Sequence, residues 1–257
     1  MSPLARRVPV SAVLIGVAAF AGSGCVDVES MIFIRQVNLP VETGNQCIVE
    51  PNPQGPFISH GTLDVAFRQE YIAGLVVGSQ IVSQGNLTRL RTETSRVRIE
   101  GVEARLENAS GGLVWGPHTI PATGFIDPSS GTSPSYGVVD ATLVGADFGA
   151  KMATQLAADA SRSGRHYTSI SKVFGHTLGN QAVDSGEFHF PITICFGCLI
   201  YYPAEANDPK VAPNPNCDLP QSTGTALAVG CTPGQDEMVD CRVCKATYPT
   251  AAICEPY

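Results

Sequence analysis

Residues 96–107, RVRIEGVEARLE, decide the fold of this chain. Side chains of an extended strand point alternately to its two faces, and here Val97 and Ile99 share one face while charged residues occupy the other. After Gly101 the alternation shifts by one residue, and Val102 begins the next apolar series. A one-residue shift at a glycine is what a β-bulge produces. Arg and Glu alternate on the opposite face, which indicates an antiparallel sheet with one side in water.

Short strands separated by turns are predicted along most of the remaining chain. Residues 71–82 are apolar enough to form either a strand buried on both faces or a hairpin broken near Gly78. Pro191 places its strand at a sheet edge, because proline cannot donate a hydrogen bond to a neighbouring strand. Residues 111–135 are rich in turn formers and are expected to form turns. Strands are expected at residues 31–39, 62–67, 71–82, 96–107, 136–144, 166–178 and 187–194.

Two segments depart from this pattern. Residues 147–163 predict the one good helix, because Phe148, Met152 and Leu156 recur every four residues on a face that would pack on the core. The last 55 residues, from Pro203, are proline-rich and hold five of the nine cysteines. The predicted fold is therefore mainly β. It is an antiparallel β-sandwich, immunoglobulin-like only in its texture of short strands and turns, with one inserted helix and a disulfide-rich C-terminal tail packed on it.

The N-terminal residues have the three parts of an export signal. Two arginines precede an apolar run at residues 8–21, and small residues then lead to Cys25. This run is shorter than the ~20 residues that a membrane-spanning helix needs. The sequence Gly22-Ser23-Gly24-Cys25 resembles the lipobox of bacterial lipoproteins, although Gly22 stands where an aliphatic residue is usual. The resemblance implies a signal peptide at residues 1–24 and a lipid on Cys25, which would tether the protein to a membrane.

A second cleavage site competes with the lipobox. Residues 19–21, Ala-Phe-Ala, match an A-x-A signal, and cleavage there would release a periplasmic or secreted protein. The chain has nine cysteines, so a lipid on Cys25 leaves an even set of eight that can pair completely. The residue after Cys25 is Val26, which by resemblance to lipoproteins of double-membrane bacteria favours the outer membrane. The expected organisation is a signal peptide at 1–24, a β-sandwich at 25–202 and a cysteine-rich tail at 203–257.

Charge and motif content exclude several functions. The formal net charge is −7, and removing residues 1–25, with two arginines and no acids, makes it −7 − 2 = −9. An acidic chain without a Lys/Arg cluster argues against a nucleic-acid partner. The sequence holds no H-E-x-x-H, no G-x-S-x-G, no phosphate loop and no EF-hand loop. We therefore expect no catalytic residues, no cofactor and no metal.

The cysteines leave three alternatives open. Residues 195–198 and 241–244 are both C-x-x-C units, which together could bind one zinc ion through four thiolates. Either unit could instead be a thiol-redox site, which requires a helix start to lower the thiol pKa. The interpretation we favour is four structural disulfides, whose connectivity has 105 possibilities. We expect disulfides to tie the tail to the strand that ends at residues 195–198. The disulfide candidates are Cys47, Cys195, Cys198, Cys217, Cys231, Cys241, Cys244 and Cys254.

Two weaker metal hypotheses come from other residues. His176 and His189 would meet if their strands paired, with Asp184 or Glu187 as a third ligand. The acidic stretch at 234–240 could bind calcium weakly, although a solvated loop is the simpler interpretation.

The expected function follows from location more than from chemistry. The sequence predicts an exported, lipid-anchored envelope protein with a structural, adhesive or assembly role, with a possible envelope or surface protein as partner. The alternative is an envelope module that binds a small ligand, a glycan or a metal. The cysteine-rich C-terminal pattern also resembles predicted lipoproteins of gliding soil bacteria, which is consistent with the outer membrane.

Overall fold

The fold is taken from a computed structural model of the chain, which describes residues 31–44, 46–85, 92–159, 163–207, 210, 214–217, 230–248 and 252–255. The signal peptide and Cys25 lie outside the described residues.

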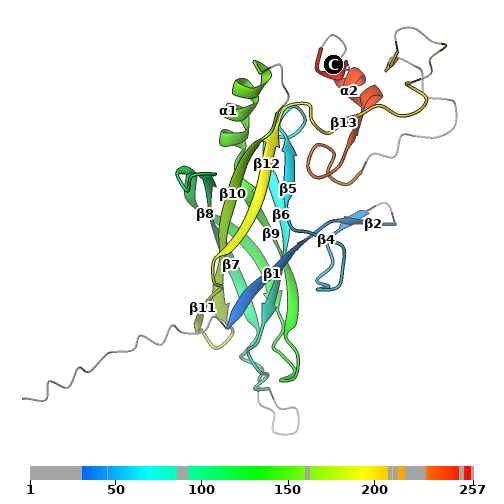
Figure 1. The fold of residues 1–257 in the computed structure, drawn as a ribbon. Helices are drawn as coiled ribbons and strands as arrows, with labels where there is room; N and C mark the ends of the chain where they lie inside the picture. Colours follow the sequence, from blue (N-terminus) through cyan, green and yellow to red (C-terminus); the bar gives the residue numbers. More distant parts are fainter. Residues whose placement is uncertain are drawn as a thin grey trace, which may run out of the picture.

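Two β-sheets pack face to face and confirm a mainly β, antiparallel sandwich (Figure 1). The first sheet has the strand order β4-β1-β6-β9, and the second has the order β5-β12-β10-β7-β8 with β11 added beside β10. All pairs within the two sheets are antiparallel except β5 with β12, which is parallel. The first sheet consists of β1 (Ile32–Asn38), β4 (Phe57–Ile58), β6 (Tyr71–Ser79) and β9 (Ser135–Val144). The second consists of β5 (Gly61–Asp64), β7 (Val97–Asn108), β8 (Leu113–Ile126), β10 (Arg165–Thr177), β11 (Ala182–Asp184) and β12 (Phe188–Cys195).

The predicted bulge lies in β7, at the centre of the second sheet. In the pairing with β10, Phe174 faces Gly101 and the next residue, Gly175, faces Ile99, so Glu100 is the extra residue. The pairing with β8 shifts at the same place. Val97, Ile99 and Val102 are all buried, which shows that the bulge keeps both halves of the strand facing the core.

The prediction of turns was wrong for residues 113–126, which form β8, a strand of 14 residues. Its prolines, Pro117 and Pro121, are tolerated because β8 ends the second sheet and pairs there only with β7. Gly116 has φ +82°, and a Cβ atom there would lie 2.7 Å from the carbonyl oxygen of Ala104. Glycine is therefore required at this irregularity. The sequence prediction failed because the many glycines and prolines of this edge strand are also typical of turns.

Strand β6 resolves the alternative left open for residues 71–82. It is an unbroken strand in which Gly78 pairs with both Phe33 and Tyr136. Every residue of β6 except Ile72 is buried. Its outer face is covered because Phe33 lies over Gly78 and Val49 lies over Gly74, and a Cβ atom at either glycine would clash with that side chain.

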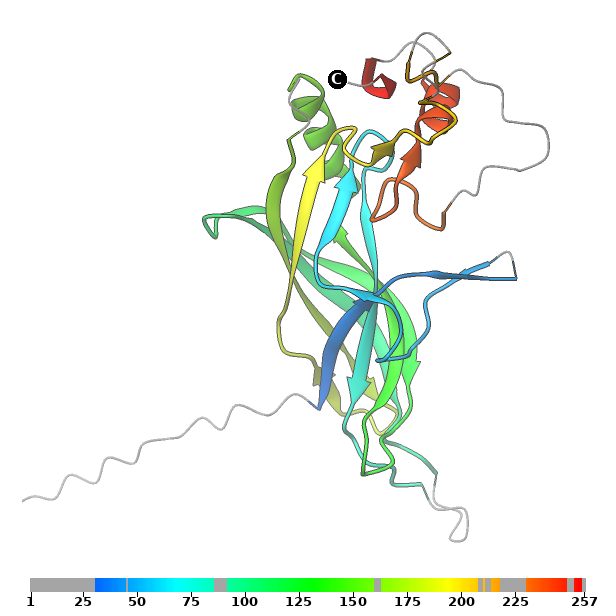
Figure 2. The same ribbon diagram turned by 45° about the vertical axis from the view of Figure 1, so that its right-hand side comes forward.

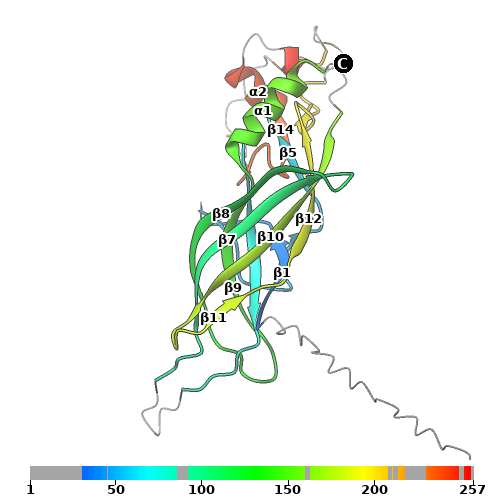
Figure 3. The ribbon, with the colours of Figure 1, turned by 90° about the vertical axis from the view of Figure 1, so that its left-hand side faces the viewer.

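The inserted helix is confirmed as α1, although it ends earlier than expected, at Ala157 (Ala146–Ala157). Phe148, Met152 and Leu156 are buried against the sandwich, as the four-residue spacing predicts. Figures 1 and 3 show α1 at the end of the sandwich opposite to the start of β1.

The tail contains a helix that the sequence did not suggest and lies at the same end of the sandwich as α1 (Figure 2). Helix α2 (Cys241–Thr247) follows the short strand β14 (Val239–Asp240), which pairs in parallel with β13 (Ile200–Tyr201). Asp240 caps α2 by accepting a hydrogen bond from the backbone N–H of Arg242 at 2.8 Å. A 3₁₀ turn, η1 (Ala252–Cys254), completes the described tail.

Candidate functional site

A pocket of about 240 Å³ lies on the outer face of the first sheet, beneath a projecting arm. We define the arm as β2 (Val41–Thr43) and β3 (Gln46–Ile48) with the flanking residues Leu39, Pro40 and Val49. It projects from the side of the sandwich in Figures 1 and 2. Residues 72–74 of β6 form one wall of the pocket, and the absent side chain of Gly74 makes room for Val49.

A disulfide closes the pocket between the arm and the tail. Cys47 in β3 bonds to Cys231 with an S–S distance of 2.05 Å, across 184 residues of sequence. Both cysteines line the pocket. Both strands of the arm are exposed, so this disulfide fixes the arm over β6. We call the Cys47–Cys231 disulfide the strap.

The tail side of the pocket is attached by hydrogen bonds that imitate strand pairing. The amide of Gln235 accepts from the N–H of Ile72 at 3.1 Å and donates to the carbonyl oxygen of Ile72 at 2.6 Å. The N–H of Asp64 donates to Gly234, and the N–H of Asp236 donates to Thr62. The tail thereby extends the second sheet beyond β5, and the backbone groups at that edge have partners.

A half-buried acid, Asp236, joins these contacts. The Asp236 carboxylate accepts from the N–H of Thr62 at 2.6 Å and from the Tyr71 hydroxyl at 2.5 Å. Burial raises the pKa of Asp236, and the hydrogen bonds from Tyr71 and Thr62 oppose that rise. Burial and the neighbouring Asp236 both raise the pKa of Tyr71. Tyr71 therefore stays protonated at neutral pH and serves as a donor, which suits a structural contact better than proton transfer.

Two charged side chains line the pocket without a partner of their own. Arg68 is half-buried on the loop before β6, and Asp140 is exposed on β9 opposite Gly74. Among the described residues, neither side chain forms a hydrogen bond or an ion pair. The pocket thus combines an apolar wall with the cationic Arg68 and two acids, of which Asp236 already accepts from Tyr71 and Thr62 and Asp140 could be engaged by a small polar ligand.

All eight disulfide candidates are paired, but the connectivity differs from the expectation. The disulfides are Cys47–Cys231, Cys195–Cys198, Cys217–Cys241 and Cys244–Cys254. Cys195 and Cys198 bond to each other, so they do not tie the tail to the strand. That role belongs to Cys47, because the tail enters from the side of the arm. The two C-x-x-C units share no site, which rules out the four-thiolate zinc arrangement in this oxidised form.

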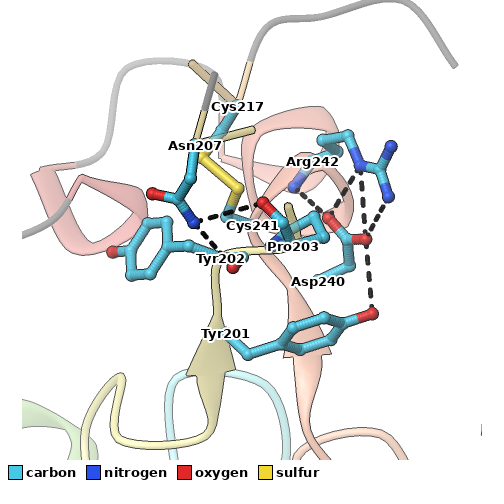
Figure 4. Close-up of polar contacts among 8 residues, drawn as sticks. All are labelled: Tyr201, Tyr202, Pro203, Asn207, Cys217, Asp240, Cys241 and Arg242. Atoms are coloured by element: carbon cyan, nitrogen blue, oxygen red, sulfur yellow. Dashed lines mark hydrogen bonds and ion pairs between the residues drawn. A yellow bond between two sulfur atoms is a disulfide. The ribbon is translucent and has the colours of Figure 1, made fainter. Parts of the chain in front are cut away.

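The second C-x-x-C unit does begin a helix, α2. Figure 4 shows its first cysteine, Cys241, bonded to Cys217 beside Asp240 and Arg242. Its cysteines face different partners, since Cys241 bonds to Cys217 and Cys244 bonds to Cys254. Burial acts to raise the pKa of Asp240, but the hydrogen bonds from Arg242 outweigh it and lower that pKa. Asp240 also accepts from the Tyr201 hydroxyl at 3.4 Å. These contacts build a small second core around the disulfides rather than a redox site.

The structure separates His176 from His189, so the predicted histidine metal site is wrong. His176 lies in the part of β10 that pairs with β11, whereas His189 pairs with Ile170 nearer the other end of β10. Each histidine contacts a different acid: Nδ1 of His176 lies 3.0 Å from Glu100, and Nε2 of His189 lies 3.7 Å from Glu187.

The acidic stretch at 234–240 does not converge on a cation either. Asp236 points to Tyr71, Asp240 points to Arg242, and Glu237 accepts from the N–H groups of Cys231 and Thr232 at 3.1 and 2.6 Å. Each carboxylate accepts hydrogen bonds from its own donor. In a calcium loop, by contrast, the carboxylates must converge on one ion.

Sequence reasoning predicted the strand at residues 62–67 but did not identify its Asp64 as a site residue. Asp64 is fully buried and accepts from the N–H groups of Ala66, Gly197 and Leu199 at 3.1, 2.7 and 3.0 Å. Gly197 and Leu199 lie more than 130 residues from Asp64 along the chain, and no local signal in the sequence indicates these contacts.

Comparison with protein-family models and with curated proteins finds no match for this chain. No helix among the described residues is long and apolar enough to cross a membrane.

Proposed function

We propose that the chain is an exported envelope protein, anchored by a lipid on Cys25, with a structural, adhesive or assembly role and no catalysis. The observation that carries this proposal is the pairing of all eight other cysteines in four disulfides. Disulfides persist in exported proteins and are rare in the cytosol. Cys25 is then the single cysteine left over, as the resemblance to a lipobox implies.

The position of β1 supports a direction for the proposed anchor. Cys25 precedes the first strand residue, Ile32, by seven positions, which can span at most about 25 Å. The start of β1 lies at the end of the sandwich opposite to α1 and the tail (Figures 1 and 3). A lipid on Cys25 would hold that end near the membrane and present the tail and the arm outward.

Intact mass of the protein from native membranes tests the anchor. We expect loss of residues 1–24 and a triacylated Cys25, and we expect a Cys25→Ala variant to leave the membrane fraction. A mature chain that begins at Gly22 without lipid would refute the anchor and favour the secreted form.

A second candidate function is binding of a small ligand in the pocket under the arm. Arg68 and Asp140 favour it, because neither side chain has a polar partner among the residues that the structure describes, and such an ionic group is available to a ligand. A volume of about 240 Å³ and the opposite charges of Arg68 and Asp140 suit a small zwitterion such as a free α-amino acid. Calorimetric titration with single amino acids tests this. Arg68→Gln and Asp140→Asn should weaken any binding. Lys151→Gln should not, because Lys151 is an exposed residue of α1 and does not line the pocket.

A further inference from the structure

The geometry points to a second site on this protein: on reduction, Cys195, Cys198 and Asp64 form a three-ligand binding site for Zn²⁺. This site lies where β12 ends beside β5 and is separate from the pocket under the arm. Among the described residues it is the one group of three or more His, Cys, Asp and Glu side chains whose ligand atoms all lie within 4.8 Å of one another.

The first observation is the chemistry of the three ligands. Two thiolates and one carboxylate match the sulfur and oxygen ligands that Zn²⁺ accepts, with a fourth position left for water. In the disulfide form the sulfurs are bonded to each other and are not metal ligands. The site is therefore closed when oxidised and opens only after two-electron reduction.

The second observation is that hydrogen bonds hold the turn at residues 195–199 in addition to the disulfide. The buried Asp64 carboxylate accepts hydrogen bonds from Gly197 and Leu199, the residues on either side of Cys198. The backbone N–H of Val65 also donates to the carbonyl oxygen of Cys195 at 2.8 Å. These bonds would hold both cysteines near the carboxylate after the S–S bond opens, so a ligand set already in place awaits the metal.

The third observation is access. Cys195 is fully buried, but Cys198 is exposed. By contrast, all four cysteines of the disulfides Cys217–Cys241 and Cys244–Cys254 are buried. The strap is the other disulfide with an exposed cysteine, at Cys47, and the experiment must separate the two.

The reaction requires a dithiol reductant. One thiolate of the reductant attacks Sγ of Cys198, which forms a mixed disulfide and releases Cys195 as a thiolate. The second thiol of the reductant then resolves the mixed disulfide, so the reductant is oxidised and the pair is reduced by two electrons. Binding of Zn²⁺ displaces the remaining thiol protons.

The test uses the full folded chain in a Cys47→Ser/Cys231→Ser background, which removes the strap. Mild native reduction with dithiothreitol, alkylation and peptide mapping should label Cys195 and Cys198 and leave the four buried cysteines unlabelled. Without alkylation, the reduced protein should then bind one Zn²⁺ per chain, measured by mass spectrometry, and the oxidised protein none. With Co²⁺ as a probe, the absorption spectrum should show thiolate charge transfer and a tetrahedral ligand field.

Two controls identify the ligands. A further Cys195→Ser/Cys198→Ser change should abolish metal uptake while circular dichroism stays native. Asp64→Asn should weaken Zn²⁺ binding at least tenfold, and if that variant fails to fold, the Co²⁺ spectrum of the parent still reports the ligand set. Failure to release these two thiols without unfolding, or release without metal uptake, would overturn the proposal, as would unchanged affinity in a folded Asp64→Asn variant.

Discussion

Tyr71 is the residue at which the sandwich and the tail depend most directly on each other. It is fully buried in β6, and its hydroxyl donates to Asp236 in the tail. A Cβ atom at Gly61 would lie 2.5 Å from the same hydroxyl, so the neighbouring chain is shaped around it. Removing this one oxygen would leave the half-buried Asp236 carboxylate with one donor fewer, which is costly because charged groups lose most when their partners are lost.

We predict that Tyr71→Phe lowers the free energy of unfolding at pH 7 by about 1–3 kcal/mol, the cost of an unsatisfied buried acceptor. Urea unfolding followed by circular dichroism measures it. Tyr201→Phe is the matched control, because Tyr201 is more exposed and its hydrogen bond to Asp240, at 3.4 Å, is longer. A loss in Tyr71→Phe no larger than in Tyr201→Phe would show that the Tyr71–Asp236 contact adds little.

The same tyrosine predicts a dependence on alkaline pH. Its pKa is raised in the folded state by burial and by Asp236, so folding favours the protonated form. Stability is then fully present below the unfolded pKa of about 10 and falls as the pH rises above it. We expect Tyr71→Phe to flatten this loss by up to about 1.4 kcal/mol per pH unit, measured by urea unfolding between pH 9 and 11. Identical slopes for both proteins would contradict the prediction.

At the scale of elements, the bulge in β7 holds the second sheet in register. Glu100 is the residue without a counterpart in β10, and the strand bulges there so that the buried residues on its two sides lie on one face. Deleting Glu100 would leave Ile99, Gly101 and Val102 in strict alternation, so we predict that this variant folds, whereas deleting Glu103, which pairs regularly with Lys172, should prevent folding because it would turn Ala104 and the apolar residues after it toward water. Proteolysis and the dispersion of amide NMR signals would report this.

Glu100→Ala is the control for the deletion of Glu100, because it removes the same side chain and keeps the length of the strand. It removes side-chain contacts with Arg98 and His176 at the exposed face of the sheet. Surface ion pairs contribute about 0–1 kcal/mol, so this variant should fold with nearly the parent stability. A folded Glu103 deletion variant with native amide signals would contradict the prediction, as would a Glu100 deletion variant that fails to fold.

The strap is the second feature at the scale of elements, and its contribution to the free energy of unfolding can be measured. Cys47→Ser/Cys231→Ser should lower the free energy of unfolding by about 2–5 kcal/mol, because a long loop of unfolded chain is no longer closed. The disulfide Cys244–Cys254 closes a loop with a separation of only 10 residues, so its removal in Cys244→Ser/Cys254→Ser should lower the free energy of unfolding by less. Hydrogen exchange should accelerate in β2 and β3 only in the first variant. The reverse order of stabilities would contradict this argument.

For the whole molecule, we predict that the sandwich and the tail unfold as one cooperative unit. The tail has only a small core of its own, and Gln235, Asp236 and Cys231 attach it to β6, β5 and the arm. Scanning calorimetry should show a single transition whose calorimetric and van't Hoff enthalpies agree. Two resolved transitions would show that the tail is an independent unit.

How much of this could be predicted from sequence depended on the range of the interactions. Local alternation was sufficient for β7 with its bulge, for β6 and for α1, because each pattern reflects burial within one element. It failed for β8, whose glycines and prolines suit an edge strand as well as a turn. The buried Asp64, the partners of the cysteines and the pocket under the arm all arise from contacts between distant parts of the chain, which a single sequence does not reveal.

The strap also determines how this protein would transmit force. If the chain were held at Cys25 and pulled through its tail, tension would run along the residues up to Cys47, cross the covalent bond to Cys231 and continue to the C-terminus. Residues 48–230, which include all of the second sheet and most of the first, would lie outside the path of that tension. Only β1, the short strand β2 and the last part of the tail could be drawn out, so nearly the whole sandwich would stay folded under a load that peels away its first strand.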